Sequence, residues 1–162
     1  MFEPPIEFEE ANGSVVIEAE RYTDALDGSW IERADHAGFT GHGYVVDHFT
    51  LEGPPRGWSE TRGLMYRVDL TGGDYRVWVR RRIPPVWGTR GRGGESSDSA
   101  WIGVDGVVLG TTPEGGASGS WEWVPVGSIP LAAGAHQVEL RVREGGLAVD
   151  RIVLTRGDGP PA

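Results

Sequence analysis

The sequence has no cysteine and no lysine, and its apolar runs are short. Without cysteine, the chain has no disulfide framework and no cysteine metal or redox centre. No apolar run approaches the ~18 residues of a membrane-spanning helix, so no membrane partner is expected. The 15 basic residues are all arginine, and 24 acidic residues leave a net charge of −9. Because nucleic acid attracts basic surfaces, this acidic chain is not expected to bind it.

Helical periodicity is scarce as well, whereas turn-forming and aromatic residues are frequent. The 162 residues include 26 glycines, 11 prolines and 7 tryptophans. Apolar and polar residues alternate in short segments such as 15–20, 65–70 and 75–80, as they do in half-buried strands. Asp105-Gly106 separates two apolar segments and is typical of a tight hairpin turn. The pattern predicts an all-β fold, specifically a two-sheet antiparallel β-sandwich or jelly roll.

Residues 14–156 are expected to form a single sandwich module, because they contain all of the alternating segments. Residues 1–13 carry proline and charge without such a pattern, so they are interpreted as an N-terminal linker or extension. Residues 157–162 are interpreted in the same way as a C-terminal tail. Residues 1–11 lack the basic and apolar regions of a signal peptide, which indicates a cytoplasmic protein or an excised module.

Three acidic residues are candidates for a metal site. Glu18 and Glu20 flank Ala19 in an alternating segment, so their carboxylates project from one face of a strand. Asp150 lies in the apolar run 147–154, where a buried carboxylate needs a partner. If the first and last strands are close, the three side chains offer the oxygen ligands that calcium prefers. The alternative is that Glu18 and Glu20 form a solvated polar face and that Asp150 pairs with an arginine.

Several short segments follow one another in an order that is more specific than any one of them. These segments are residues 16–20, Trp30 with residues 38–45, residues 97–106, residues 121–123, residues 131–136 and residues 143–155. In this order they resemble carbohydrate-binding modules of families 6 and 35, and the resemblance covers nearly the whole chain. Accessory β-sandwich domains attached to glycoside hydrolases share the same order.

The resemblance implies a jelly roll with a structural calcium ion. The acidic ligands of the family match Glu18, Glu20 and Asp150, and backbone carbonyls of residues 38–43 would complete the shell. Such an ion stabilises the fold because it binds only the native state. No catalysis by this ion is implied.

The resemblance also implies a non-catalytic module that binds a polysaccharide or oligosaccharide and is covalently linked to a catalytic domain. Such a module would be extracellular or at the cell surface, as part of a bacterial protein, and we expect a monomer. The four histidines have no zinc-ligand spacing and no G-x-S-x-G segment occurs, which favours a chain that is not an enzyme. The alternative is a structural or interaction domain of the same fold, attached to a glycoside hydrolase or lyase. Ala148 favours that alternative, because many family members have a sugar-binding asparagine there.

Aromatic residues in loops are candidates for sugar binding, because rings pack against the apolar faces of sugars. Trp87 lies in the loop of residues 83–98 and matches the family's position for an aromatic platform. Phe39 and His36 lie in the other loop that the family brings to this cleft, and Trp58 is a further exposed candidate. Packing within the protein is the alternative for each of them. Trp30, Trp78 and Trp101 are interpreted as structural, and Trp121 and Trp123, which share one strand face, are expected to be buried.

Arginines cluster in a segment that contains no acidic residue. Residues 75–94 hold six of the 15 arginines. Arg90 shares its loop with the candidate tryptophan, and arginine forms bidentate bonds with carboxylate or sulfate. An acidic ligand, such as a uronic or sulfated sugar, is therefore one hypothesis. The alternative is that Arg76, Arg80 and Arg82 form one polar strand face and pair with acids across the sheet.

Overall fold

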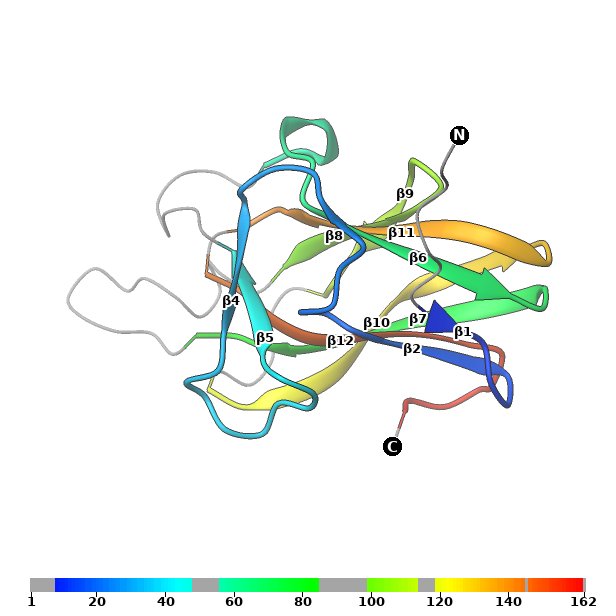
Figure 1. The fold of residues 1–162 in the computed structure, drawn as a ribbon, viewed down its shortest axis with the longest axis horizontal. Helices are drawn as coiled ribbons and strands as arrows, with labels where there is room; N and C mark the ends of the chain where they lie inside the picture. Colours follow the sequence, from blue (N-terminus) through cyan, green and yellow to red (C-terminus); the bar gives the residue numbers. More distant parts are fainter. Residues whose placement is uncertain (1–7, 48–55, 85–98, 114–118, 145, 162) are drawn as a thin grey trace.

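A computed structural model describes residues 8–47, 56–84, 99–113, 119–144 and 146–161, which form two β-sheets lying face to face (Figure 1). The strands of the first sheet are β1 (Phe8–Glu9), β3 (Asp24–Ala25), β6 (Leu64–Leu70), β8 (Ala100–Val104), β9 (Val107–Thr111) and β11 (Gly134–Val142). Those of the second sheet are β2 (Ser14–Glu18), β4 (Trp30–Arg33), β5 (Tyr44–Asp47), β7 (Gly73–Arg82), β10 (Trp121–Leu131) and β12 (Ala148–Thr155). A 3₁₀ helix, η1 (Trp58–Glu60), precedes β6.

The strand order of each sheet follows from pairing between distant segments. The first sheet has the order β1-β6-β11-β8-β9, with β3 also paired to β6. The second has the order β10-β7-β12-β5-β4, with β2 also paired to β12. β1 and β6 are parallel, and the other strand pairs in the described residues are antiparallel. The predicted two-sheet sandwich is therefore confirmed, with one parallel pair added.

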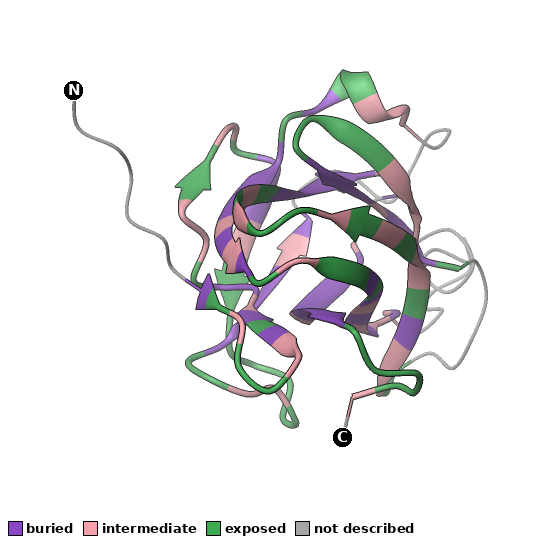
Figure 2. Ribbon diagram, turned by 90° about the vertical axis from the view of Figure 1, so that its right-hand side faces the viewer, coloured by how far each residue is buried: buried purple, intermediate pink, exposed green. Residues whose placement is uncertain are grey.

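The alternation of apolar and polar residues decides which face of each strand is buried. In β7, Tyr75, Val77 and Val79 are buried in the core, whereas Arg76 is exposed and Arg80 is partly exposed on the opposite face. Buried residues of both sheets gather between the two layers (Figure 2). Within the part of the chain that the structure describes, no helix is long and apolar enough to cross a membrane.

The sandwich begins nearer the N-terminus than the sequence indicates. Phe8 is buried and its ring centroid lies 6.4 Å from that of Tyr66. Glu10 then accepts a hydrogen bond of 2.6 Å from the hydroxyl of Thr71 and an ion pair of 3.0 Å from Arg156. The first strand, β1, thus lies within the segment 1–13 that the sequence pattern indicates as a linker. Two residues are too short a segment to show an alternating pattern, and their partner strand lies about sixty residues away in the chain.

A β-bulge in the pairing of β12 with β7 positions the side chain of Asp150. Val149 is opposite Arg81 and Arg151 is opposite Arg80, so Asp150 has no counterpart in β7. A bulge of this kind turns a side chain away from the regular alternation, and bulges are common beside functional sites. It lets an acidic residue of a mostly buried strand face the loop between β4 and β5, hereafter the β4–β5 loop (residues 34–43).

The predicted hairpin turn is confirmed and is tied to a neighbouring strand. Asp105, with φ of 54°, and Gly106 join β8 to β9. One carboxylate oxygen of Asp105 lies 2.6 Å from Nδ1 of His136, and Nε2 of His136 lies 2.7 Å from the carbonyl oxygen of Ala132. Both ring nitrogens thus face acceptors, which favours the imidazolium form.

The stability of the domain is expected to fall as His136 loses its proton. Although burial opposes it, the hydrogen bonds to Asp105 and Ala132 raise the pKa of His136 above its ordinary value. The resulting stabilisation is fully present below the unfolded pKa of about 6.5 and disappears as the pH rises through the folded pKa. We expect a loss of at most about 1 kcal/mol, because Asp105 is partly exposed. Urea unfolding between mildly acidic and mildly basic pH measures it, and His136→Gln, which cannot titrate, should remove this part of the pH dependence.

Candidate binding site on the second sheet

The three predicted metal ligands lie together beneath the β4–β5 loop. The hydroxyl of Thr40 donates to Glu18 at 2.8 Å, and the backbone N–H of Thr40 donates to Asp150 at 3.0 Å. The backbone N–H of His42 donates to Oε1 of Glu20 at 3.0 Å. β2, which ends at Glu18, and β12, which contains Asp150, are adjacent, as the sequence required for these acids to meet. One loop therefore contacts all three carboxylates.

Two of the three acids are also paired with arginine. Arg80 Nη1 lies 2.6 Å from an oxygen of Asp150, whose side chain is 0% exposed. Arg151 Nε lies 3.0 Å from Glu18, its partner in the register of β12 with β2. The pairing of Asp150 with an arginine, which the sequence left open, is thus confirmed. The arginine pairing of Asp150 and the closeness of the three acids are therefore both present in the structure.

Glu20 differs from Glu18 and Asp150, because it is buried and forms no ion pair with an arginine among the described residues. The residue is 8% exposed, and its Oε2 has no hydrogen-bond partner among the described residues. Burial raises the pKa of Glu20, and the nearby charges of Glu18 and Asp150 raise it further. Glu20 is therefore not part of a solvated polar face.

The carboxylate oxygens at and around Glu20 are suitable ligands for a hard cation. Arginine side chains, however, already neutralise part of their negative charge. An orphaned carboxylate oxygen beside two further carboxylates is the kind of ligand that calcium prefers. Arg80 and Arg151, however, already contact Asp150 and Glu18. Among the described residues, no group of three or more acidic, histidine or cysteine side chains is arranged to hold a metal ion. Glu20 supports a cation site, and the two guanidinium groups would compete with it.

Beside the acids, four aromatic side chains form a cluster around Tyr44, hereafter the aromatic cluster (His36, Phe39, Tyr44 and Trp121). The ring centroid of Tyr44 lies 6.2 Å from His36, 5.8 Å from Phe39 and 5.1 Å from Trp121. Tyr44 is fully buried, His36 is exposed, and Phe39 and Trp121 are partly exposed. The structure therefore brings together two residues selected as sugar-binding candidates. Trp121, which was expected to be buried, keeps part of its surface open.

Polar contacts hold these rings in place. The hydroxyl of Tyr44 donates to Asp35, and burial together with this bond raises the pKa of Tyr44 to about 12. The indole N–H of Trp121 donates to the carbonyl oxygen of Ala37 at 2.9 Å. Gly38 approaches Trp121 so closely that an added Cβ would lie 2.7 Å from ring atom Cδ1, and its φ of +104° also favours glycine. The β4–β5 loop is thus fitted to the aromatic cluster.

Arg80 links the aromatic cluster to the acids. Besides Asp150, its Nη1 donates to the carbonyl oxygen of Gly38 at 2.7 Å, and its guanidinium carbon lies 5.5 Å from the ring centroid of Trp121. Neither Arg80 nor Trp121 was selected as a site residue from the sequence. The alternation of β7 indicated that Arg80 was on the outer face, but its contact with Trp121 depends on the pairing of β7 with β10.

The arginines of β7 do not form one free basic patch. Arg80 pairs with Asp150, and Arg81 is buried on the opposite face, 3.1 Å from Glu122. Arg76 lies 3.6 Å from Asp158 at the exposed surface. Pairing with acids is therefore confirmed for Arg76 and Arg80.

The other sequence candidates lie elsewhere. Trp87 and Arg90 lie outside the described residues. Trp58, in η1, packs against the first sheet, where the guanidinium carbon of Arg141 of β11 lies 3.7 Å from its ring centroid. Gly103 of β8 is so close to Trp58 that an added Cβ would lie 2.3 Å from its ring. The ring of Trp58 is therefore used in packing and is not brought to the aromatic cluster.

Ala148, which stands where many of the modules that the sequence resembles have an asparagine, lies in the second sheet. Ala148 is 3% exposed and is paired with Val46 of β5 and Arg82 of β7. The methyl side chain offers no hydrogen bond to a ligand.

Comparisons with known proteins identify the fold. No family model matches the chain, and no curated protein matches it. The structure is similar to a family 35 carbohydrate binding module from an environmental isolate, with a TM-score of 0.57 and 23% identity over 91% of this chain and 97% of that one. It is similar to a family 35 module from Clostridium thermocellum, with a TM-score of 0.58 and 19% identity over 87% of this chain and 96% of that one. The chain has the sandwich fold of these modules.

A larger protein contains a similar part. The Podospora anserina GH26-CBM35 beta-(1,4)-mannanase matches 94% of this chain with a TM-score of 0.61 and 21% identity. This chain spans 28% of the mannanase chain. The likeness therefore concerns one part of that enzyme.

Proposed function

We propose that the chain is a non-catalytic carbohydrate-binding module and that its ligand contacts the aromatic cluster. The observation that carries the proposal is the gathering of Phe39, His36 and Trp121, each at least partly exposed, around buried Tyr44. Ring faces held rigidly beside polar groups are suited to the alternating apolar and hydroxyl surfaces of a sugar. The fold shared with family 35 modules supports the same function.

We further propose that the module directs a covalently linked glycan-active enzyme to polysaccharide outside the cell. The mannanase comparison supports this arrangement, because the matching part is one portion of a longer enzyme chain. An acidic sugar, uronic or sulfated, remains our hypothesis for the ligand, and it rests on Arg90, which shares its loop in the sequence with Trp87. Ala148 and the pairing of Arg80 support the alternative, a structural domain without a sugar site.

The sugar-binding proposal is tested by truncating one ring. Phe39→Ala is expected to weaken binding to a polysaccharide at least tenfold, or by about 1.4 kcal/mol, because the ring is partly exposed in the β4–β5 loop. Affinity electrophoresis in gels containing polygalacturonate or glucomannan measures the effect for an acidic and a neutral polymer. Trp58→Ala is the matched control, since Trp58 packs on the other sheet and its loss is expected to leave binding unchanged.

The same gels test the charge of the ligand. If the ligand is acidic, Arg90→Ala and added salt should both weaken retardation by polygalacturonate and not by glucomannan. Equal retardation of wild type and Arg90→Ala at all salt concentrations would contradict the acidic ligand. No retardation by either polymer would favour the structural domain.

We also propose that calcium stabilises this module. Glu20 would supply its orphaned oxygen, with Glu18 and Asp150 as further ligands. A bound calcium ion would supply positive charge to a buried acidic group and would join β2, β12 and the β4–β5 loop.

A further inference from the structure

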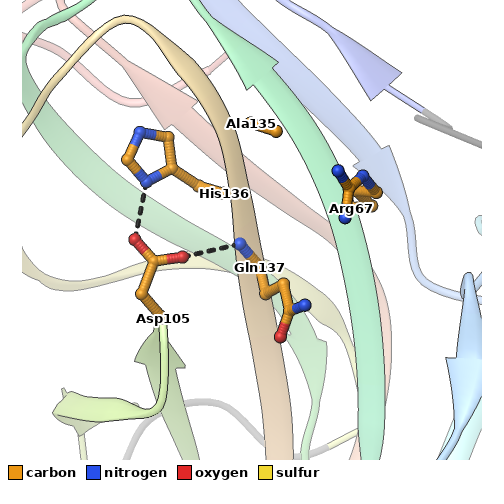
Figure 3. Close-up of a pocket in the computed structure, with 5 residues that line it drawn as sticks. All are labelled: Arg67, Asp105, Ala135, His136 and Gln137. Carbon is orange, nitrogen blue, oxygen red and sulfur yellow. Dashed lines mark hydrogen bonds and ion pairs between the residues drawn. The ribbon is translucent and has the colours of Figure 1, made fainter. Parts of the chain in front are cut away.

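A concave surface lies on the first sheet. It has a volume of about 310 Å³ and is lined by Arg67, Asp105, Ala135, His136 and Gln137. Figure 3 shows Asp105 reaching from the β8–β9 turn to β11, with Arg67 across β11 on β6. The residues of this pocket are distinct from Glu18, Glu20 and Asp150 and from the members of the aromatic cluster. The volume is near the lower limit of about 300 Å³ for small-molecule sites, so one sugar ring is a suitable size.

The pocket exists because a small residue stands between larger polar ones. In the register of β11 with β6, Gln137 is opposite Arg67 and Ala135 is opposite Asp69. Arg67, Ala135 and Gln137 therefore alternate onto one face of the two strands. The methyl group of Ala135 leaves space beside the long side chains, and the β8–β9 turn closes the space on one side.

The carboxylate of Asp105 is held in one orientation. Its Oδ1 accepts a hydrogen bond of 2.9 Å from the backbone N–H of Gln137, and its Oδ2 lies 2.6 Å from His136. The backbone N–H of Asp105 donates in turn to the carbonyl oxygen of Gln137 at 2.8 Å. The side chain of Asp105 is nevertheless 46% exposed, and each carboxylate oxygen has a second lone pair. A pre-oriented acceptor therefore faces the pocket.

The mixture of groups selects a class of ligand. The carboxylate of Asp105, although paired with His136, would repel a bound anion, and the guanidinium of Arg67 would repel a bound cation. A neutral molecule with adjacent hydroxyl groups can donate to Asp105 and accept from Arg67, and Gln137 offers both a donor and an acceptor. Such paired hydroxyls occur on the ring of a pyranose sugar.

We propose that this pocket, hereafter the β11 pocket, is a second binding site that takes one neutral pyranose residue, oriented by Asp105, Gln137 and Arg67. The proposal does not depend on the aromatic cluster, because its ligand class follows from the pocket residues alone. If both sites bind parts of one polysaccharide, the second contact raises the effective concentration of the first.

The experiment is an NMR titration of the isotopically labelled chain with the methyl glycosides of glucose, galactose and mannose. At concentrations up to about 100 mM, which saturate even a millimolar site, at least one glycoside should shift the backbone amide of Gln137 and the ring signals of His136 in a saturable way. Gln137→Ala should weaken this response at least fivefold, and Asp105→Asn should remove it. Asparagine tolerates the positive φ of position 105, so the turn is preserved.

Phe39→Ala separates this proposal from the function proposed above. The β11 pocket should keep its response in Phe39→Ala, even if polysaccharide binding at the aromatic cluster is lost or was never present. Absence of a saturable response to all three glycosides in the wild-type chain would overturn the proposal. So would a response that Gln137→Ala and Asp105→Asn leave unchanged. If Asp105→Asn loses its dispersed spectrum, Gln137→Ala decides, because its side chain is exposed.

Discussion

Replacing Arg80 by methionine is expected to lower the free energy of unfolding by about 3–5 kcal/mol. Methionine keeps much of the packing volume of the side chain and removes the charge. Asp150, whose side chain is 0% exposed, would lose its ion pair of 2.6 Å while its carboxylate stayed buried. Leaving one charge of a buried pair uncompensated is among the most destabilising substitutions. Chemical denaturation with urea, at constant m-value, measures the change.

Arg76→Met is the matched control for this substitution. Arg76 is on the same face of β7, but it lies 3.6 Å from Asp158 and both side chains are well exposed. Its removal is expected to cost less than about 1 kcal/mol. The double variant Arg80→Met, Asp150→Asn should lose less than the sum of the single losses, because each single variant leaves the other partner unpaired. Equal costs for Arg80→Met and Arg76→Met would contradict the central role of the Arg80–Asp150 pair.

Calcium is expected to raise the melting temperature by about 5–10 °C when present at roughly a hundred times its dissociation constant. Binding to the native state alone contributes about 2.7 kcal/mol at that excess. For a domain of about 150 residues, each kcal/mol shifts the midpoint by about 2–4 °C. Differential scanning calorimetry in calcium and in chelator measures the difference. An unchanged midpoint would contradict the proposed calcium site.

Glu20→Gln should have opposite effects on the melting temperature in chelator and in calcium. In chelator the variant should melt at or above the wild type, because burial raises the pKa of Glu20 and its charged form opposes folding. The contribution of Glu20 in the calcium-free protein is fully present below its unfolded pKa and is lost as the pH rises through the folded pKa. In calcium the variant should lose most of the rise in melting temperature that the wild type shows. Glu60→Gln, at an exposed position of η1, is the control and should keep it.

Much of the fold could be predicted because it depends on local patterns. The period of two in β7 and β6, and the turn formed by Asp105-Gly106, are properties of neighbouring residues, and the structure confirms them. β1 was not predicted, because its two residues become a strand only through their partner in β6. For the same reason the first sheet includes Phe8 and Glu9, which precede residue 14.

The candidate site was predicted in part. The spacing of Glu18 and Glu20, and the apolar surroundings of Asp150, were sufficient to select the acids that the structure brings together. Whether a neighbouring arginine or a metal would compensate them could not be decided, since both readings use the same residues. Trp58 keeps part of its surface exposed, as its glycine and serine neighbours indicate, but the packing of Arg141 over its ring could not be predicted from these neighbours.

The sequence by itself determined the all-β class, most of the strands, the hairpin turn and the acidic residues that meet. These features follow from alternation, turn preference and the need of a buried carboxylate for a partner, which act over short distances along the chain. The tertiary structure alone decided that Arg80 joins Asp150 to the aromatic cluster, and that Asp105 and Arg67 border one pocket. Both depend on strand register, and the first also depends on the bulge at Asp150; these features arise when segments up to about 140 residues apart pair and pack around a common core.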